Sequence, residues 1–170
     1  MTRREEIKKE DNGFISEAKI YCDGASSGNP GHAGIGVVIQ VRGHLHKDYK
    51  ISEYIGIATN NVAEYSALIR GLEEARSLGL KKIEIFLDSE LLVRQIKGVY
   101  RISSANLKPL WQKSKNMLRE FDNYRMTHVP RELNKEADLL AKKSIKKSII
   151  KSVPEASGLK AAYYPSIEEK

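Results

Sequence analysis

The sequence predicts a single α/β domain, built on a mixed β-sheet with helices packed against it. Two patterns lead to this prediction. Up to about residue 57, short strand-like segments follow one another through short connections, which is typical of an antiparallel meander. From residue 60, helical segments alternate with short apolar strands, which favours parallel strands joined by crossovers. A length of 170 residues leaves little room for a second domain.

The antiparallel part contains three expected strands. Ala18–Asp23 is the first, and we expect the Gly-, Ser- and Pro-rich segment GASSGNPG that follows to lack regular structure. Gly34–Val41 is the second strand. A turn at Arg42–His44 leads into the third, over residues 45–57, where polar and apolar residues alternate.

The second part begins with a helix from Asn60, because apolar residues recur there at steps of three and four, and Gly79 provides a stop signal. A strand and a helix follow in turn, and then a further helix, strand and helix. The expected ranges are a strand over 82–88, helices over 89–97 and 107–121, a strand over 125–129 and a helix over 134–150.

The domain itself is expected to cover residues 17–152. We expect residues 1–16 to form a charged, flexible lead-in and residues 153–170 to form a tail without regular structure. No apolar run is long enough to cross a bilayer, and the N-terminus does not resemble a secretion signal. The single cysteine, Cys22, excludes an internal disulfide and disfavours a thiolate zinc site. We therefore expect a cytoplasmic protein, monomeric by default.

The net charge of +7 suggests a polyanionic partner without identifying one. The excess is concentrated in residues 139–152, which carry five lysines and no acid. Our hypothesis is that four of them contact nucleic-acid phosphates, although a solvated helix face is the default explanation for such a run. These four are Lys142, Lys143, Lys146 and Lys147.

Four acidic residues occupy positions where the pattern predicts burial. Asp23 and Asp88 end apolar strands, whereas Glu64 and Asp138 share helical faces with apolar residues near the start of their helices. A carboxylate facing a core is unfavourable unless it is paired, hydrogen-bonded or bound to a metal. Taken singly, each has an ordinary explanation, as a turn or capping residue or as a residue at the edge of its apolar stripe.

Taken together, the four acids indicate a metal site. If the strands ending in Asp23 and Asp88 are parallel neighbours, both carboxylates emerge at the same end of the sheet, where ligands of α/β sheets usually bind. Two helix starts then add Glu64 and Asp138. Carboxylates gathered in this way repel one another without a cation, and their hard oxygen ligands suit Mg²⁺ or Mn²⁺.

The segments around these acids resemble the four signature blocks of type 1 ribonuclease H, in the order found in that family. The resemblance covers about residues 18–145. The compact pattern of this sequence is similar to that of the archaeal and thermophilic branch of the family. The four segments are Tyr21–Ser26 (YCDGAS), Thr59–Glu64 (TNNVAE), Leu87–Ser89 (LDS) and Arg131–Ala141 (RELNKEADLLA).

The resemblance implies a ribonuclease H-like fold, with a five-stranded mixed sheet, three antiparallel strands followed by parallel ones, and helices on both faces. It also implies an endonuclease that hydrolyses the RNA strand of RNA–DNA hybrids with two Mg²⁺ ions, or Mn²⁺ in their place, leaving 5′-phosphate and 3′-hydroxyl ends. Asp23 would bridge both ions, and Glu64, Asp88 and Asp138 would complete their shells, with the Gly24 backbone as a further, weaker ligand. Double-stranded RNA is a possible additional substrate.

Matched to the family, Asn60 and Asn61 contact the minor groove, with Asn29 nearby, and Thr59 contacts a DNA phosphate. Amides suit this role because they both donate and accept hydrogen bonds, and the 2′-hydroxyl is the group that distinguishes RNA from DNA. For Asn60 a helix cap is an equally good explanation.

The sequence departs from the family pattern in the loop before Asp138. Many members carry a longer, glycine-rich loop with a mobile histidine there, whereas this chain has only the short stretch from His128 to Asn134. We expect His128 to belong to the preceding strand. Arg131 is the better candidate for assisting near the leaving group, and a surface salt bridge is its alternative role.

A second departure is the absence of a basic protrusion between the helices that follow Asp88, and Trp111 there is expected to pack into the core.

Two other functions compete with the proposed one. A transposase- or resolvase-like nuclease acting on DNA would assemble similar carboxylates, and a binding-only module would hold hybrids without cutting them.

Overall fold

The computed structural model describes residues 17–42 and 47–152. The predicted lead-in over residues 1–16, most of the turn before the third strand, and the predicted tail over residues 153–170 lie outside the described residues. Among the described helices, none has the length and apolar character needed to span a membrane.

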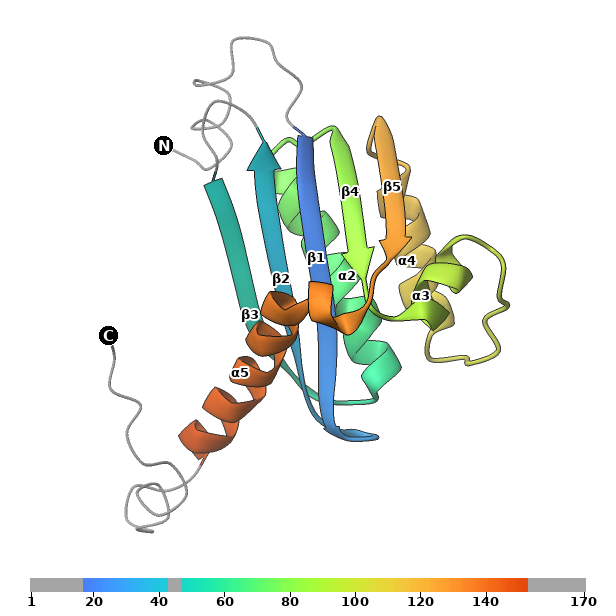
Figure 1. Ribbon diagram of the computed structural model, residues 1–170. Helices are drawn as coiled ribbons and strands as arrows, with labels where there is room; N and C mark the ends of the chain where they lie inside the picture. The colour runs from blue at the N-terminus through green and yellow to red at the C-terminus, as the bar shows by residue number, and fades with distance from the viewer. Residues whose placement is uncertain (1–16, 43–46, 153–170) are drawn as a thin grey trace.

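A five-stranded mixed sheet, in the order β3-β2-β1-β4-β5, forms the centre of the fold (Figure 1). β1 pairs antiparallel with β2, and β2 antiparallel with β3, as the short connections predict. β1 also pairs parallel with β4, and β4 parallel with β5, as crossovers predict. The strands are β1 (Glu17–Gly28), β2 (Gly31–Arg42), β3 (Lys47–Ala58), β4 (Lys82–Leu87) and β5 (Asn123–His128).

The expectation that GASSGNPG lacks regular structure is wrong. β1 continues to Gly28 and β2 begins at Gly31, so that only Asn29 and Pro30 form the turn between them. The pairing runs out to Gly28 opposite Gly31, which gives every residue of this small-residue segment outside the two-residue turn a partner in a long hairpin. Pairing with a neighbouring strand has overridden the low strand propensity of Gly and Ser.

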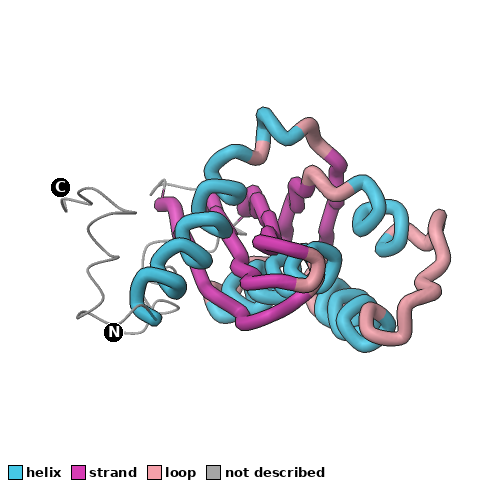
Figure 2. The backbone as a smooth tube through the Cα atoms, turned by 90° about the horizontal axis from the view of Figure 1, so that it is seen from below, coloured by secondary structure: helices cyan, strands magenta, loops and turns pink. Residues whose placement is uncertain are grey.

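Helices cover both faces of the sheet. α2 packs against β1 and β2 on one face, with α4 beside it, and α5 packs across β2, β1 and β3 on the other (Figures 1 and 2). A single 3₁₀ turn, η1 (Arg131–Leu133), was not expected and leads directly into α5. The helices are α2 (Asn60–Ser77), α3 (Glu90–Ile96), α4 (Lys108–Leu118) and α5 (Lys135–Ser152).

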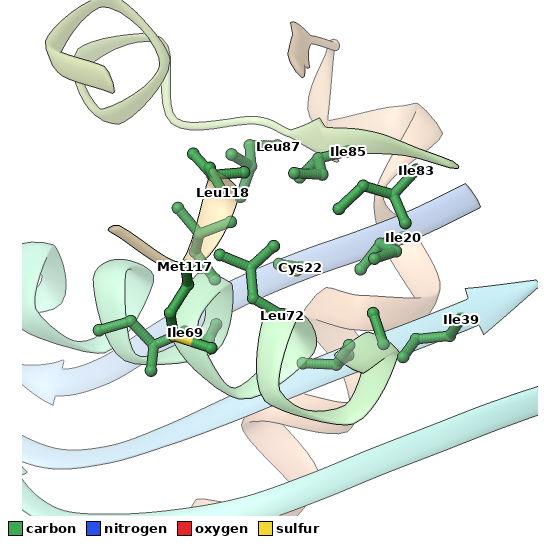
Figure 3. Close-up of a cluster of buried hydrophobic side chains, with 14 of the residues drawn as sticks. Ile20, Cys22, Ile39, Ile69, Leu72, Ile83, Ile85, Leu87, Met117 and Leu118 are labelled. Atoms are coloured by element: carbon green, nitrogen blue, oxygen red, sulfur yellow. The ribbon is translucent and has the colours of Figure 1, made fainter. Parts of the chain in front are cut away.

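The main hydrophobic core lies between the sheet and the face of α2 and α4 (Figure 3). Ile20 and Cys22 of β1 and Ile85 of β4 are fully buried there, opposite Leu68 and Leu72 of α2. Each such aliphatic side chain contributes about 1.5–3 kcal/mol to folding when it leaves water. Trp111 packs against this core, as predicted, and donates a hydrogen bond from Nε1 to the Gln95 carbonyl at 3.2 Å.

On the other face, α5 lies directly on the backbone of β2. A Cβ atom at Gly36 would stand 1.9 Å from the Ala137 carbonyl oxygen, and one at Gly34 would stand 1.9 Å from the Ser144 hydroxyl. Only glycine permits this approach. Ser52 of β3 adds a hydrogen bond to the Leu140 carbonyl at 2.6 Å. The start of α5 is thereby held against the sheet end that carries Asp23.

Candidate active site

The structure brings the four predicted acids together at one end of the sheet. Tyr21 of β1 pairs with Phe86 of β4, so the parallel register places Asp23 level with Asp88, the residue that follows β4. Glu64 projects from the start of α2 and Asp138 from the first turn of α5. The Asp88 side chain hydrogen-bonds with Asp23, and the negative charges of Asp138 and Glu64 lie near enough to raise the pKa of Asp23.

Gly24 allows α2 to come this close to β1. A Cβ atom at this position would lie 2.1 Å from the Ala63 carbonyl carbon and 2.3 Å from the Glu64 backbone nitrogen. Any larger residue would therefore push the start of α2 away from the strand that carries Asp23. The glycine after Asp23 therefore sets the spacing between the strand that carries Asp23 and the helix that carries Glu64.

Asp23 is 7% exposed, and burial is the largest reason why its pKa is raised to about 8. The negative charges of Asp88 and Asp138, a hydrogen bond with the Asp88 side chain and the charge of Glu64 raise the pKa further. Carboxylates that share a site behave in this way when no cation balances them. Such a perturbed acid at a strand end is characteristic of a functional site.

Glu64 is held in place by two hydrogen-bond donors. The Ser89 hydroxyl donates to Oε2 at 2.6 Å, and the Asn60 amide donates to Oε1 at 3.0 Å. Burial nevertheless dominates, so that the pKa of Glu64 is raised despite these two bonds. Ser89 also accepts the Leu92 backbone N–H as the N-cap of α3, which links the position of Glu64 to that helix.

Asp138 differs from the other acids because two cations contact it. Arg131 Nη2 lies 2.6 Å from Oδ1, and Lys142 Nζ lies 2.7 Å from Oδ2. Burial is the largest single influence and favours a higher pKa, but the hydrogen bonds and charges of Lys142 and Arg131 outweigh it and lower the pKa of Asp138. This carboxylate therefore stays ionised beside Asp23.

The donor set fits hard divalent cations. All four side chains offer carboxylate oxygens, the ligands that Mg²⁺ and Mn²⁺ prefer. Over residues 17–42 and 47–152, no three acidic, His or Cys side chains are arranged so that they could hold a metal ion as they stand. Both oxygens of Asp138 are engaged by cationic side chains.

The predicted substrate-binding residues surround the start of α2. Thr59, and not Asn60, caps the helix, because its hydroxyl accepts the Val62 backbone N–H at 3.3 Å. The cap explanation for Asn60 is therefore wrong. Asn29 accepts the backbone N–H of Asn60 at 3.2 Å, which places it where predicted, and Asn61 is exposed on the first turn.

The structure also shows where the remaining predicted residues lie, which are His128, Arg131 and the four lysines of α5. His128 is the last residue of β5 and is exposed, as expected for a strand residue. Arg131 lies at the site through its bond to Asp138. The four predicted lysines of α5 are all exposed, and Lys142 donates a hydrogen bond to Asp138 at 2.7 Å.

Two residues at the site were not predicted from the sequence as functional. Ser89 was predicted only as the start of a helix, and Asn134 likewise. Asn134 is 1% exposed, and its amide donates hydrogen bonds to the Cys22 carbonyl at 2.9 Å and to Asp88 Oδ1 at 3.0 Å. An Asn before a helix is a common cap signal, so no sequence pattern could reveal that this side chain is buried between two strands.

Known proteins share both the sequence pattern and the fold. Residues 21–144 match the family described as reverse transcriptase-like. The ribonuclease HI of Halobacterium salinarum is 41% identical over 125 residues, which cover 74% of this chain and 62% of that protein. The ribonuclease H of Prosthecochloris aestuarii is 34% identical over 146 residues, which cover 75% of this chain and 94% of that protein.

A solved structure also agrees with this chain in sequence and in fold. LC11-RNase H1, determined in complex with an RNA/DNA hybrid, is 42% identical and superimposes with a TM-score of 0.71 over 78% of this chain and 99% of that chain. This chain spans less than two thirds of the Halobacterium protein's length. From the sequence pattern, the mixed sheet and these relatives together, the chain belongs to the reverse transcriptase-like family and, within it, to the type 1 ribonucleases H.

Proposed function

We propose that the chain is an endonuclease that hydrolyses the RNA strand of RNA–DNA hybrids and leaves 5′-phosphate and 3′-hydroxyl ends. The observation that carries this proposal is the convergence of Asp23, Glu64, Asp88 and Asp138 at one end of the sheet, beside the amides at the start of α2. The relative that was solved with an RNA/DNA hybrid supports the choice of substrate.

Two divalent cations bound to the four carboxylates would supply an activated water and stabilise the charge on the departing 3′ oxygen. Asp23, whose pKa is affected by all three other acids, would contribute to holding both cations. Ser89 and Asn60 fix the carboxylate of Glu64, which leaves it oriented toward the site when the substrate binds. The Asn134 amide donates to Asp88 Oδ1 and holds that carboxylate in the same way.

Recognition of RNA over DNA is assigned to the start of α2. Asn60 donates one amide hydrogen bond to Glu64, and the exposed Asn61 presents its amide to solvent beside it. Together with Asn29, these groups can donate to and accept from a ribose 2′-hydroxyl in the minor groove. A deoxyribose offers no such partner, which makes the DNA strand a poor fit at the same position.

A cleavage assay tests the proposal. An end-labelled RNA–DNA hybrid is incubated with Mg²⁺ or Mn²⁺, in parallel with single-stranded RNA, duplex RNA, duplex DNA and an EDTA control. We expect metal-dependent cutting of the RNA in the hybrid, with duplex DNA intact, and the duplex RNA arm reports whether that substrate is also accepted. Cutting of duplex DNA alone would favour a transposase-like nuclease, and hybrid binding without cutting would favour a binding-only module.

We expect Arg131→Ala to lower kcat on the hybrid about tenfold, while His128→Ala leaves it within about twofold. Arg131 contacts Asp138 and its side chain is 64% exposed, so it can turn to the departing oxygen, whereas His128 ends an edge strand. Single-turnover kinetics at saturating Mg²⁺ measure both effects. Equal losses in the two variants would contradict the assignment of Arg131.

We expect the lysine cluster of α5 to strengthen hybrid binding through phosphate contacts. Replacing all four lysines with Gln should flatten the dependence of the hybrid Kd on salt concentration, because fewer counterions are released on binding. Fluorescence anisotropy in Ca²⁺, across a range of KCl concentrations, gives the slope. A slope that equals that of the unsubstituted protein would show that this helix face stays in solvent. The four residues are Lys142, Lys143, Lys146 and Lys147.

A further inference from the structure

Asn134 connects the three elements that carry Asp23, Asp88 and Asp138. It lies between η1 and α5, and its backbone carbonyl accepts the Asp138 N–H at 3.1 Å. Its side-chain amide reaches the Cys22 carbonyl of β1, one residue before Asp23, and the carboxylate of Asp88 after β4. One residue thus contacts β1, the end of β4 and the start of α5.

The chemistry of these contacts requires an amide. Nδ2 carries two hydrogens, and each has an acceptor, at 2.9 Å and 3.0 Å. Oδ1 of Asn134 is buried and has no hydrogen-bond partner among the described residues. A buried polar atom without a partner costs about 1–3 kcal/mol, so this arrangement is not the most stable one for the site. Leu or Ala would remove both donors, and Asp would replace them with a further negative charge beside Asp88.

The backbone of Asn134 strengthens the link. Its N–H donates to the Arg131 carbonyl at 3.0 Å, and Arg131 in turn contacts Asp138 through its side chain. A displacement of Asn134 would therefore move Asp88 relative to β1 and, at the same time, move Asp138 and its arginine. Asn134 thus joins Asp88 directly to the β1 backbone beside Asp23.

We propose that Asn134 is a positioning residue, which sets the spacing of Asp23, Asp88 and Asp138 for divalent-cation binding without contacting the substrate. This inference rests on the proposed function and adds a residue to it. Groups that orient metal ligands typically contribute 10–100-fold to metal affinity or activity. The expected defect is therefore in metal binding, with hybrid binding left intact.

The experiment compares the unsubstituted protein with Asn134→Ala and with Asn134→Ser, which keeps one donor. We expect Asn134→Ala to weaken Mn²⁺ binding, measured by calorimetry without nucleic acid, by about tenfold or more. The Mg²⁺ concentration for half-maximal kcat should rise by a similar factor, and high Mg²⁺ should restore much of the rate. For Asn134→Ser, both the Mn²⁺ affinity and the Mg²⁺ requirement should lie between those of the unsubstituted protein and those of Asn134→Ala. The hybrid Kd in EDTA should be the same for all three proteins.

Leu118→Ala provides the matched control, since Leu118 is 1% exposed in α4 and its truncation destabilises the fold away from the acids. It should lower the Tm while leaving the Mn²⁺ affinity unchanged. Asn134 variants that lose stability like this control but keep normal Mn²⁺ affinity and Mg²⁺ dependence would overturn the proposal. The calorimetric readout needs no cleavage, so it remains decisive even if the protein does not cut hybrids.

Discussion

Asp23→Asn is expected to abolish hybrid cleavage, by about 10³-fold or more, and at the same time to stabilise the metal-free protein. The loss of activity follows because Asp23 is the central ligand of the proposed site. The gain in stability follows because the carboxylate is 7% exposed among three other acids, and an amide of the same shape removes that repulsion. We expect the free energy of unfolding to rise by about 2 kcal/mol, which corresponds to a rise in Tm of about 4–8 °C in EDTA.

The stabilisation should depend on pH in a defined direction. The folded pKa of Asp23 is raised to about 8, so the folded state holds a proton that the unfolded chain has already released above about pH 4. The metal-free protein therefore loses stability as the pH rises from about 4 to about 8, and Asp23→Asn should remove this loss. Thermal melts in EDTA across this range, followed by circular dichroism, measure the difference between the two proteins.

Asp138→Asn is the matched control for this prediction. It should also inactivate the enzyme, but it should lower the free energy of unfolding at neutral pH by about 1 kcal/mol, because Arg131 and Lys142 lose the negative charge between them and an amide offers one oxygen acceptor in place of two. The pKa of Asp138 is lowered, so its contribution is present at neutral pH and disappears as the pH falls through that pKa. Stability changes of the same sign in both variants would contradict the electrostatic description of the site.

Gly24→Ala is expected to cost about 3 kcal/mol of unfolding free energy and to lower kcat at least about tenfold. A Cβ atom there would stand 2.1 Å from the Ala63 backbone, and backbone atoms cannot move aside as side chains do. The start of α2 must therefore shift, and Glu64 shifts with it. Urea unfolding and single-turnover cleavage at a temperature where the variant is folded measure the two effects separately.

Gly71→Ala tests whether this effect is specific to the site. Gly71 lies farther along the same α2–β1 interface, and a Cβ atom there would first meet the side chains of Cys22 and Ile20, at 3.0 and 3.2 Å. These side chains can adjust, so we expect a loss of about 1 kcal/mol or less and normal kcat. If both glycine variants lost activity equally, the close approach at Gly24 would have no special role.

The order and type of the strands and long helices could be predicted because they depend on local patterns. The apolar repeat after Asn60 and the short apolar run before Asp88 each specify their element, and their order allows little freedom in topology. The convergence of the acids follows from that topology together with the position of each acid in its element. The continuation of β1 through GASSGNPG was missed, because that pairing depends on a partner strand whose register the local composition does not reveal.

The contacts that orient the acids were beyond sequence reasoning for a different reason. Thr59 and Asn60 are both good capping residues, and only the three-dimensional placement of Glu64 decides which amide is used to hold it. Likewise, the pairing of Asp138 with Arg131 spans the short turn that leads into α5, whose η1 turn was not expected. The sequence could identify the ligands, whereas their orientation depends on distances of a few ångströms between elements.

The packing of α5 on the glycines of β2 has a consequence for how the molecule becomes active during folding. Asp138 belongs to the last described helix, which reaches its place only against strands that are already paired. The meander of β1 to β3 has local pairings, whereas the docking of α5 on β2 closes a long loop among the described residues. We therefore expect Asp138 to join the other three acids late in folding, so that a partly assembled chain lacks the complete site.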